Sequence, residues 1–600
     1  MNQPIWSLET LFQNAKEIKI PSYQRAYAWE EKQLNQFVSD MLEVANKNGG
    51  QYYFGHFILE ETKENEFELI DGQQRITTFV LFLMVCKLFS ENEYNNYIEK
   101  FKTVDYDQSI LEKIQKKLVI ADTKFYLQGD NTLSINRIVF ALDYFKKLFV
   151  EKKLDVNKIE RYVETLIKAH ISTHITTEKA VAVQIFELQN TRGIKLSLIE
   201  MVKAILMKAV YLRSESVETE HKINIVRAEF AKIYQLEERA ISNSFRGNLL
   251  LEDILLHHLR IVDDGSKVIH KNGDNEGKFN SPSKSDNKED AILNYIKSQI
   301  TSKQPNEVVD YIINLSEKFR MSVELVSKTL PEYDKENRLI GDVLILDKVL
   351  SLEFFLLLFH FEQTSFIQDV KFMKGWEKFL FTRDFHDRYH GLQYKDNFER
   401  LFFIISKSAI ESKSIEGILD SFIDKGFRED KMDANSLPET VKNFIVRSKD
   451  GILNNAFQLW FREKIFYTLY KYEISKHADL IMLRKIIKEG RSLEHILPQE
   501  WQWEWIEEKD PNNISQNGED FNKGIDAIIN GLGNLLIITP IENSHLSNNH
   551  PADKVYKSCV GGFYSEHNEN ASKWKNYQEW QNIIAERGGK IYEFLKDFIS

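Results

Sequence analysis

Alternating and continuous apolar positions predict a hairpin followed by a helix near the N-terminus. Residues 52–60 alternate weakly between polar and apolar side chains, as a half-buried β-strand does, and residues 67–70 have the composition of its hairpin partner. Asp71-Gly72 is a tight-turn signal. The apolar run 76–89 that follows is long enough to form a buried helix. The pattern therefore indicates strand, strand, turn and helix in that order.

Helical periodicity dominates the middle of the chain. Residues 95–180 have the pattern of amphipathic helices with short polar breaks, and helical patterning prevails again over 291–480. Ser197 and Glu200 have the spacing of a capping box, which predicts a helix over 198–207.

Three segments depart from this helical pattern. Residues 262–290 are almost free of large apolar groups and rich in Gly, Ser, Asn, Asp and Lys, which indicates a flexible surface loop or linker. Near the C-terminus, the apolar run 535–538 has the composition of a strand. The polar stretch 540–549 predicts a turn that leads into a helix.

Composition limits the class of protein. Six hundred residues, 42% of them hydrophobic, suggest about three to five domains with large buried cores. Cys86 and Cys559 lie far apart with no partner spacing, so neither a disulfide framework nor a zinc site is expected. The first residues lack the pattern of a signal peptide, and the most apolar run, 79–86, is too short to span a bilayer. These features predict a soluble, cytoplasmic protein.

The charge balance does not favour a nucleic-acid binder. The formal net charge is −11, and residues 491–600 carry ten Lys and Arg against seventeen Asp and Glu. DNA binding would then depend on local basic patches and on the charge of a bound metal ion. The candidate basic segments are Lys146, Lys147, Lys152 and Lys153 in one run, and Arg484, Lys485, Lys488 and Arg491 in another. A solvated helix face is the simpler interpretation of both runs.

Glu494, His495, Asn534 and Asn543 form the C-terminal set of candidate functional residues. A strand, turn and helix that fold back would let Glu494, His495 and Asn543 converge on one cation. A neutral imidazole can deprotonate water, and a divalent metal can hold a scissile phosphate and its leaving oxygen, so the set suits phosphodiester cleavage. Taken singly, a His before an apolar run is more often structural, and an Asn near a turn more often shapes that turn.

A second candidate set lies where the predicted hairpin feeds a helix. Residues 73–75, Gln-Gln-Arg, would stand at the helix N-terminus, where unpaired backbone N–H groups, the helix dipole and a guanidinium make a phosphate cradle. Asp-Gly turns before helices are common, so the turn alone does not establish a site. A third segment, 186–197, contains Asn190 and Arg192 and is by itself a loop followed by a capped helix.

The C-terminal motifs resemble the nuclease domain of the GmrSD-type restriction family, within the HNH branch of the His-Me finger nucleases. The matching elements are His-x-x-Pro, Gly-Asn-Leu and Asn-Ser-x-Leu-Ser-Asn-x-x-x-x-x-Lys. The resemblance implies that His495 is the general base and Glu494 a metal ligand. It implies that Asn534 orients His495 and braces the hairpin. It also makes Asn543 a metal ligand in place of the last His of the HNH pattern, and an amide oxygen suits Mg²⁺.

The N-terminal motifs resemble the other domain of the same family. Pro-x-Tyr-Gln-Arg-x-Tyr-x-Trp over 21–29 and Asp-Gly-Gln-Gln-Arg-Ile-Thr-Thr over 71–78 look like its N-terminal domain. That domain is related to the ParB/sulfiredoxin fold, and its members hydrolyse nucleoside triphosphates. The resemblance implies a nucleotide-binding role for Gln24, Arg25, Asp71, Gly72, Gln73, Gln74, Arg75, Asn190 and Arg192.

The resemblance implies an α+β, mostly helical chain in three parts. The expected parts are a ParB/sulfiredoxin-like α/β nucleotide-binding domain over 1–210 and a helical middle over 211–440 that contains the 262–290 loop. The third is an HNH-type ββα-metal nuclease domain over 441–600.

The implied function is an NTP-hydrolysing, modification-dependent DNA endonuclease that nicks or cleaves DNA in bacterial anti-phage defence. The expected cofactor is Mg²⁺ or Mn²⁺, with a nucleoside triphosphate as substrate or effector. The expected partner is modified double-stranded DNA and not a membrane. The chain could also form an oligomer. One alternative is a nucleotide-switched sensor of DNA modification with a degenerate, non-cleaving C-terminal domain. The other is a nucleotide hydrolase whose C-terminal hairpin only stabilises the fold.

Overall fold

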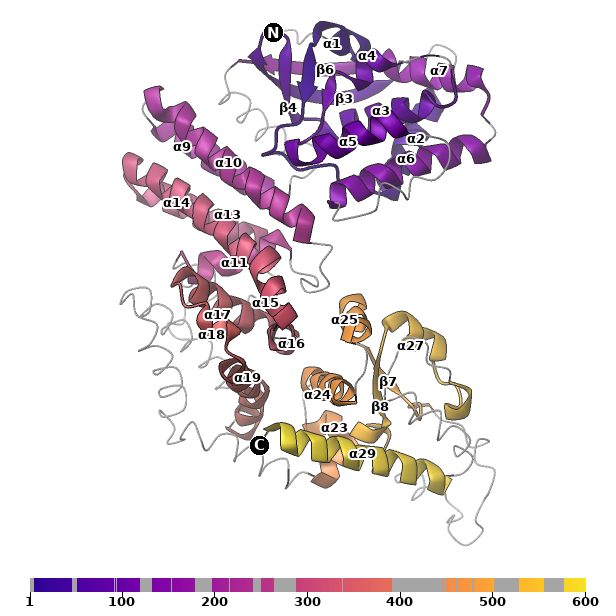
Figure 1. The fold of residues 1–600 in the computed structure, drawn as a ribbon, viewed down its shortest axis with the longest axis vertical. Coiled ribbons are helices and arrows are strands. Elements are labelled where there is room, and N and C mark those ends of the chain that lie inside the picture. The colour runs from indigo at the N-terminus through magenta and orange to yellow at the C-terminus, as the bar shows by residue number, and fades with distance from the viewer. Residues whose placement is uncertain are drawn as a thin grey trace. The chain divides into compact units, whose positions relative to one another are not determined.

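The computed structural model describes most of the chain. The described residues are 5–45, 51–118, 132–177, 197–240, 250–263, 288–390, 446, 449–476, 480–500, 528–554 and 577–599, apart from a few single positions inside these ranges. The chain divides into two compact units, each drawn in Figure 1. The first holds residues 1–243, 251–255 and 286–328, and the second holds 244–250, 256–285 and 329–600.

A mixed sheet of six strands organises the first unit, in the order β1-β6-β3-β4-β2-β5. The strands are β1 (Ile5–Ser7), β2 (Glu17–Lys19), β3 (Tyr53–Lys63), β4 (Glu66–Asp71), β5 (Phe101–Lys102) and β6 (His170–Thr176). β3 pairs antiparallel with β4, which confirms the predicted hairpin, and parallel with β6. β4 ends at Asp71, where the turn into the next helix begins.

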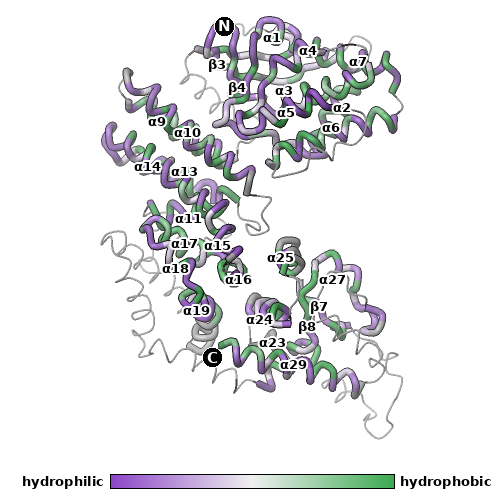
Figure 2. The backbone as a smooth tube through the Cα atoms, viewed as in Figure 1, coloured by the Kyte–Doolittle hydropathy of each residue, from purple (hydrophilic) through white to green (hydrophobic). Residues whose placement is uncertain are grey.

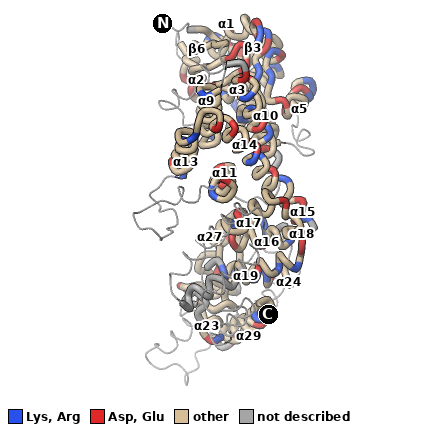
Figure 3. Tube along the Cα trace, turned by 90° about the vertical axis from the view of Figure 1, so that its left-hand side faces the viewer, with Lys and Arg blue, Asp and Glu red and all other residues tan. Residues whose placement is uncertain are grey.

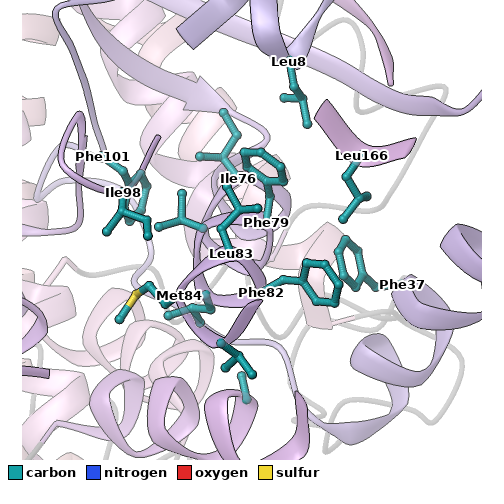
Figure 4. Packing of buried hydrophobic residues seen from close by; sticks show 14 of the residues in the cluster. Leu8, Phe37, Ile76, Phe79, Phe82, Leu83, Met84, Ile98, Phe101 and Leu166 are labelled. Carbon is teal, nitrogen blue, oxygen red and sulfur yellow. The ribbon is translucent and has the colours of Figure 1, made fainter. Parts of the chain in front are cut away.

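Helices pack beside this sheet and complete its core. They are α1 (Leu8–Asn14), α2 (Glu31–Ala45), α3 (Gln73–Cys86), α4 (Asn95–Ile98), α5 (Asp105–Lys117), α6 (Leu133–Glu151) and α7 (Val156–Ile167). Every residue of α3 from Ile76 to Cys86 is buried, which confirms the predicted helix. Phe82 and Phe37 lie together in the core shown in Figure 4, with ring centroids 6.0 Å apart. The ring centroid of Phe145 lies 5.3 Å from that of Phe82, and both pairs are edge-on. Each such buried ring stabilises the fold by about 1.5–3 kcal/mol, which fixes α3 in the core.

The expectation of helices throughout 95–180 is wrong at two places. β5 lies between α4 and α5, and β6 follows α7 as an internal strand that pairs with β1 and β3. In β6, Ile171 and Thr173 are buried while Ser172 and His174 are partly exposed. This alternation, together with its β-branched residues, suits a strand covered on one face.

Long helices follow the sheet in the sequence. They are α9 (Leu198–Arg213), α10 (Ser216–Ala240), α11 (Leu251–Ile261), α13 (Lys288–Ser302) and α14 (Pro305–Glu324), which continues into the π-helical turn η2 (Leu325–Thr329). The predicted capping box at Ser197 and Glu200 is confirmed, with both reciprocal hydrogen bonds present. Most of the predicted loop 262–290 lies outside the described residues, and α13 already begins at Lys288.

The second unit is mainly helical. Its first helices are α15 (Leu330–Glu336), α16 (Leu339–Leu346), α17 (Lys348–His360), α18 (Ser365–Gln368) and α19 (Val370–His390). Its remaining elements are α23 (Lys449–Leu459), α24 (Arg462–Ser475), α25 (Leu480–Glu489), β7 (Ser492–His495), η4 (Leu532–Asn534), β8 (Leu535–Ile538), α27 (Pro540–Leu546), η5 (Pro551–Asp553) and α29 (Tyr577–Ile599). The amphipathic helix α29 alternates between hydrophobic and hydrophilic residues (Figure 2).

These elements confirm the predicted α+β, mostly helical class, and also the predicted strand at 535–538 and the helix after it. Among the described residues, no helix is long and apolar enough to cross a membrane.

Candidate functional site

A short antiparallel sheet in the second unit positions the C-terminal candidate residues. β7 pairs with β8 so that Glu494 lies opposite Leu536 and His495 opposite Leu535. All four residues of β8 are buried, which anchors the hairpin in the core. Thr539 then caps α27 with its side chain, so the chain turns back directly after β8.

Glu494, His495 and Asn543 line one open cavity of about 570 Å³. The first two come from the end of β7, and the third comes from α27. The hairpin therefore brings together three of the four residues selected from the sequence. The other lining residues are Leu493, Pro498, Gln499, Asn530, Ser547 and Asn548.

The amide of Asn543 is held in one orientation. Its Nδ2 donates to Ser492 Oγ at 2.6 Å and to Leu493 O at 3.1 Å, both on β7. These bonds use the nitrogen and leave Oδ1 as the acceptor atom at the cavity. Asn543 thereby ties α27 to β7 as well as offering an oxygen.

Glu494 forms a buried ion pair with Lys554, the last residue of the C-terminal motif. Lys554 Nζ lies 2.5 Å from Glu494 Oε1 and donates to His495 O at 2.7 Å. Burial raises the pKa of Glu494 and lowers that of Lys554, and in each case the charge of the partner opposes the shift. One ammonium therefore fixes both Glu494 and the backbone of His495. The motif contained Lys554, but only the fold shows what it contacts.

The oxygen atoms at this cavity fit a hard divalent cation. Glu494 pairs with Lys554 through Oε1, its carboxylate also accepts from the backbone of His495, and Asn543 keeps Oδ1. Mg²⁺ and Mn²⁺ prefer carboxylate, carbonyl and water oxygens. Among the described residues, no cluster of three or more His, Cys, Asp and Glu side chains is arranged to hold a metal. A cation here would therefore complete its coordination shell with water and with oxygens of the substrate.

Asn530 contacts the His495 ring, and sequence reasoning missed it. Asn530 Oδ1 lies 3.1 Å from His495 Nε2. An amide oxygen only accepts, so this contact is a hydrogen bond when His495 carries its proton on Nε2, and Gln499 Nε2 lies 3.5 Å from the same ring nitrogen. Asn530 precedes the Gly-Asn-Leu motif by three residues, and no sequence signal identified it.

Asn534 braces the hairpin through the backbone. Its side chain is fully buried, accepts from Leu497 N at 2.8 Å and donates to Leu497 O at 2.9 Å and Ile529 O at 2.7 Å. Its described side-chain bonds thus reach the segment after His495 and not the imidazole. Asn530 contacts the imidazole ring, whereas the side chain of Asn534 holds the backbone on either side of the cavity.

Close backbone packing supports this segment from α29. A Cβ added at Gly533 would lie 1.9 Å from Ile584 O, so no larger residue fits there. Arg587 Nη1 donates to Gly533 O and Leu535 O, each at 2.9 Å. The glycine before Asn534 is therefore required for α29 to approach.

Lys554→Met should destabilise the second unit by about 3 kcal/mol or more, because it leaves the Glu494 carboxylate buried without its partner. Urea unfolding of the purified protein measures this change. The double variant Glu494→Gln/Lys554→Met should recover part of the loss. As a control, Lys590→Met removes an exposed pair with Glu586 and should change stability little. Equal stability of the wild type and Lys554→Met would contradict the role of the pair.

In the first unit, the two N-terminal motifs lie against each other. Gln24 is buried and its Nε2 donates to Ile70 O at 3.1 Å, at the end of β4. Gln74 accepts from Ala28 N at 2.7 Å and donates to Ala26 O at 3.0 Å. Both glutamine amides therefore hold the 20–28 loop beside the start of α3.

The Asp71 turn shapes the start of α3. Gly72 has φ +97°, and a Cβ there would lie 2.3 Å from the ring of Phe57, so glycine is required. Asp71 Oδ1 accepts from Gly72 N at 2.8 Å, and burial raises the pKa of Asp71 while Arg75 opposes the shift. The N–H groups in the first turn of a helix have no intrahelical partner, and no side chain at Gly72 caps those of α3.

Arg75 is partly exposed beside this turn. Its Nη2 donates to His56 O at 2.6 Å and lies 3.9 Å from Asp71 Oδ2, and its guanidinium stands 5.0 Å from the Phe57 ring centroid. Arg25 is exposed on the 20–28 loop. Asn190 and Arg192 lie outside the described residues.

The basic runs considered for DNA binding are partly engaged within the fold. Lys146 is 5% exposed, and Arg484 pairs with Asp334. Lys146 and Arg484 therefore do not belong to a solvated helix face, which was the simpler interpretation of both basic runs. Elsewhere, positive and negative residues are interspersed along the described elements (Figure 3).

Comparison with known proteins identifies two domains. Residues 8–207 match the family model described as the GmrSD restriction endonuclease, N-terminal domain, and residues 446–591 match that of the GmrSD restriction endonucleases, C-terminal domain. Together the two matches cover more than half of the chain. No curated protein matches it. The motifs at both ends and the two domain matches agree, and the chain belongs to the GmrSD restriction endonuclease family.

Proposed function

We propose that this restriction-type DNA endonuclease cuts or nicks DNA at the β7–β8–α27 cavity in the presence of Mg²⁺ or Mn²⁺. The observation that carries the proposal is the convergence of Glu494, His495 and Asn543 on one cavity, with oxygens of Glu494 and Asn543 left for a cation. The HNH assignment and the metal requirement rest on this donor set.

His495 acts as the general base. Its Nε2 lies 3.1 Å from Asn530 Oδ1, and the neutral imidazole takes a proton from the attacking water. Glu494 Oε2 and Asn543 Oδ1 would hold the metal ion, which stabilises the charge on the scissile phosphate when bound. Lys554 offsets the charge of Glu494, and Glu542 adds negative charge nearby. DNA phosphate would add further negative charge, so metal and DNA should bind cooperatively.

The N-terminal site binds and hydrolyses a nucleoside triphosphate. The unpaired N–H groups at the start of α3 and the Arg75 guanidinium together suit a polyphosphate. Gln24 and Gln74 hold the neighbouring loop, which carries the exposed Arg25. Asn190 and Arg192 remain proposed members of this site through the family resemblance.

Nucleotide state and DNA modification control the nuclease. A protein with a nucleotide site and a nuclease site in one chain gains regulation if each ligand favours one of two global states. The relevant DNA is modified double-stranded DNA, and the setting is defence of a bacterium against phage. The direction of control is an outcome of the experiment.

A plasmid-nicking assay tests this function. Wild-type protein is incubated with modified and unmodified plasmid, with Mg²⁺, Mn²⁺ or EDTA, and with or without triphosphate, and phosphate release is followed in parallel. We expect metal-dependent nicking that changes with nucleotide and with DNA modification. Phosphate release without nicking in any arm would favour the non-cleaving sensor. Identical nicking with and without nucleotide would make the two ends independent enzymes.

A further inference from the structure

Lys203 is a buried cation beside the N-terminal site to which the family resemblance gives no role. It lies on α9 and is 3% exposed. Its Nζ donates to Tyr23 O at 3.0 Å and to Gln24 Oε1 at 3.5 Å. It also lies 5.4 Å from the Tyr23 ring centroid and 5.7 Å from that of Tyr234. Among the described residues, it forms no ion pair with a carboxylate.

The surroundings of Lys203 disfavour its charge. Burial lowers the pKa of Lys203 to about 8, Glu200 opposes this shift, and Arg227 on α10 adds to it. Glu200 Oε2 accepts from both the backbone N–H and the hydroxyl of Ser197, so the carboxylate is engaged in capping α9. An ammonium held in this way is stabilised by any anion that binds nearby.

Gln24 links Lys203 to the Asp71 turn. The Gln24 amide accepts from Lys203 through Oε1 and donates through Nε2 to Ile70 O, the residue before Asp71. Glu200 also acts electrostatically on Asp71. The first turn of α9 and the start of α3 therefore lie close together.

We infer that Lys203 is a positioning residue of the nucleotide site, and that the polyphosphate of a bound nucleoside triphosphate offsets its positive charge. The inference rests on the nucleotide function proposed for the N-terminal site. Lys203 fixes the Gln24 amide and the Tyr23 carbonyl, so the 20–28 loop stays against the end of β4. A polyphosphate at the start of α3 adds negative charge to that of Glu200, whose Oε2 is engaged in capping α9.

The first test compares nucleotide affinities. Isothermal titration calorimetry at pH 7 measures binding of the Mg²⁺ complexes of the β,γ-imido analogues of ATP and GTP to the full-length protein. Lys203→Met should bind at least tenfold more weakly than the wild type, whereas Lys203→Arg should retain most of the affinity. Lys208→Met, which removes a partly exposed lysine from the same helix, should bind as the wild type does. Circular dichroism verifies that each variant is folded.

The pH dependence of nucleotide affinity distinguishes an effect of the Lys203 charge from an effect of its packing. The anion prefers protonated Lys203, so affinity should be level below pH about 8 and fall as the pH rises above it. The titratable groups on neighbouring elements that face Lys203 stay in one state in this range, because the pKa of Arg227 is raised by its neighbours Tyr23 and Glu60 and burial raises the pKa of Tyr23 and of Tyr234. Lys203→Arg should show no such fall, because the guanidinium stays charged.

Each outcome has one interpretation. If the wild type binds neither analogue, the proposed nucleotide function fails. If the wild type binds but Lys203→Met binds equally well with the same pH profile, the positioning role fails and the nucleotide site stands. If Lys203→Met does not fold, the comparison of the wild type with Lys203→Arg decides, and identical pH profiles would overturn the inference.

Discussion

Replacing His495 with alanine should lower DNA nicking by at least about 100-fold, since a general base typically contributes about 10²–10⁴-fold. The imidazole lines the cavity with Glu494 and Asn543, and its Nε2 lies 3.1 Å from Asn530 Oδ1. Its removal leaves the metal-binding oxygens in place and takes away only the proton acceptor. Time courses of plasmid nicking with Mg²⁺ or Mn²⁺ measure the effect, and triphosphate hydrolysis should be unchanged.

The matched control is His545→Ala. His545 is an exposed histidine on α27 of the same hairpin and does not line the cavity. This variant should nick plasmid at the wild-type rate, which excludes a general effect of losing a histidine there. Wild-type nicking by a correctly folded His495→Ala protein would instead remove the imidazole from the mechanism.

Local elements could be predicted from the sequence because their signals are local. The hairpin that ends at Asp71, the buried helix after it and the Ser197 capping box each depend on residues within a few positions of one another. β6 was missed because its seven residues become a strand through pairing with β3, more than 100 residues earlier. Tertiary pairing outweighed the amphipathic pattern around it.

The same distinction separates the predicted site residues from those that were missed. Glu494, His495 and Asn543 were recognised from motifs, and the fold places them on one cavity. Asn530 and Lys203 have no motif of their own. Their contacts join residues 35 and 179 positions apart, and only the folded chain brings them together. Positioning groups of this kind are therefore the part of a site that sequence reasoning is least able to find.

Arg75→Ala should suppress triphosphate hydrolysis by about 100-fold or more, because a charge-assisted contact to phosphate is difficult to replace. The bond to His56 O and the position beside Phe57 hold the guanidinium at the start of α3. A guanidinium has five N–H donors, so the bond to His56 leaves others for phosphate oxygens. Steady-state phosphate release from the variant and the wild type measures the change.

Substitution of Gly55 tests the role of Arg75 in triphosphate hydrolysis independently. Its φ is +116°, and a Cβ there would lie 1.9 Å from Arg75 Nη1, so Gly55→Ala should displace the guanidinium and also reduce hydrolysis. Arg137→Ala is the control, since this arginine on α6 pairs with Glu30 at 3.1 Å and belongs to neither N-terminal motif, so the variant should hydrolyse triphosphate normally. If both Arg75→Ala and Gly55→Ala hydrolyse triphosphate at the wild-type rate, the start of α3 is not the phosphate site. If hydrolysis is lost and nicking no longer responds to nucleotide, the Arg75 site controls the nuclease.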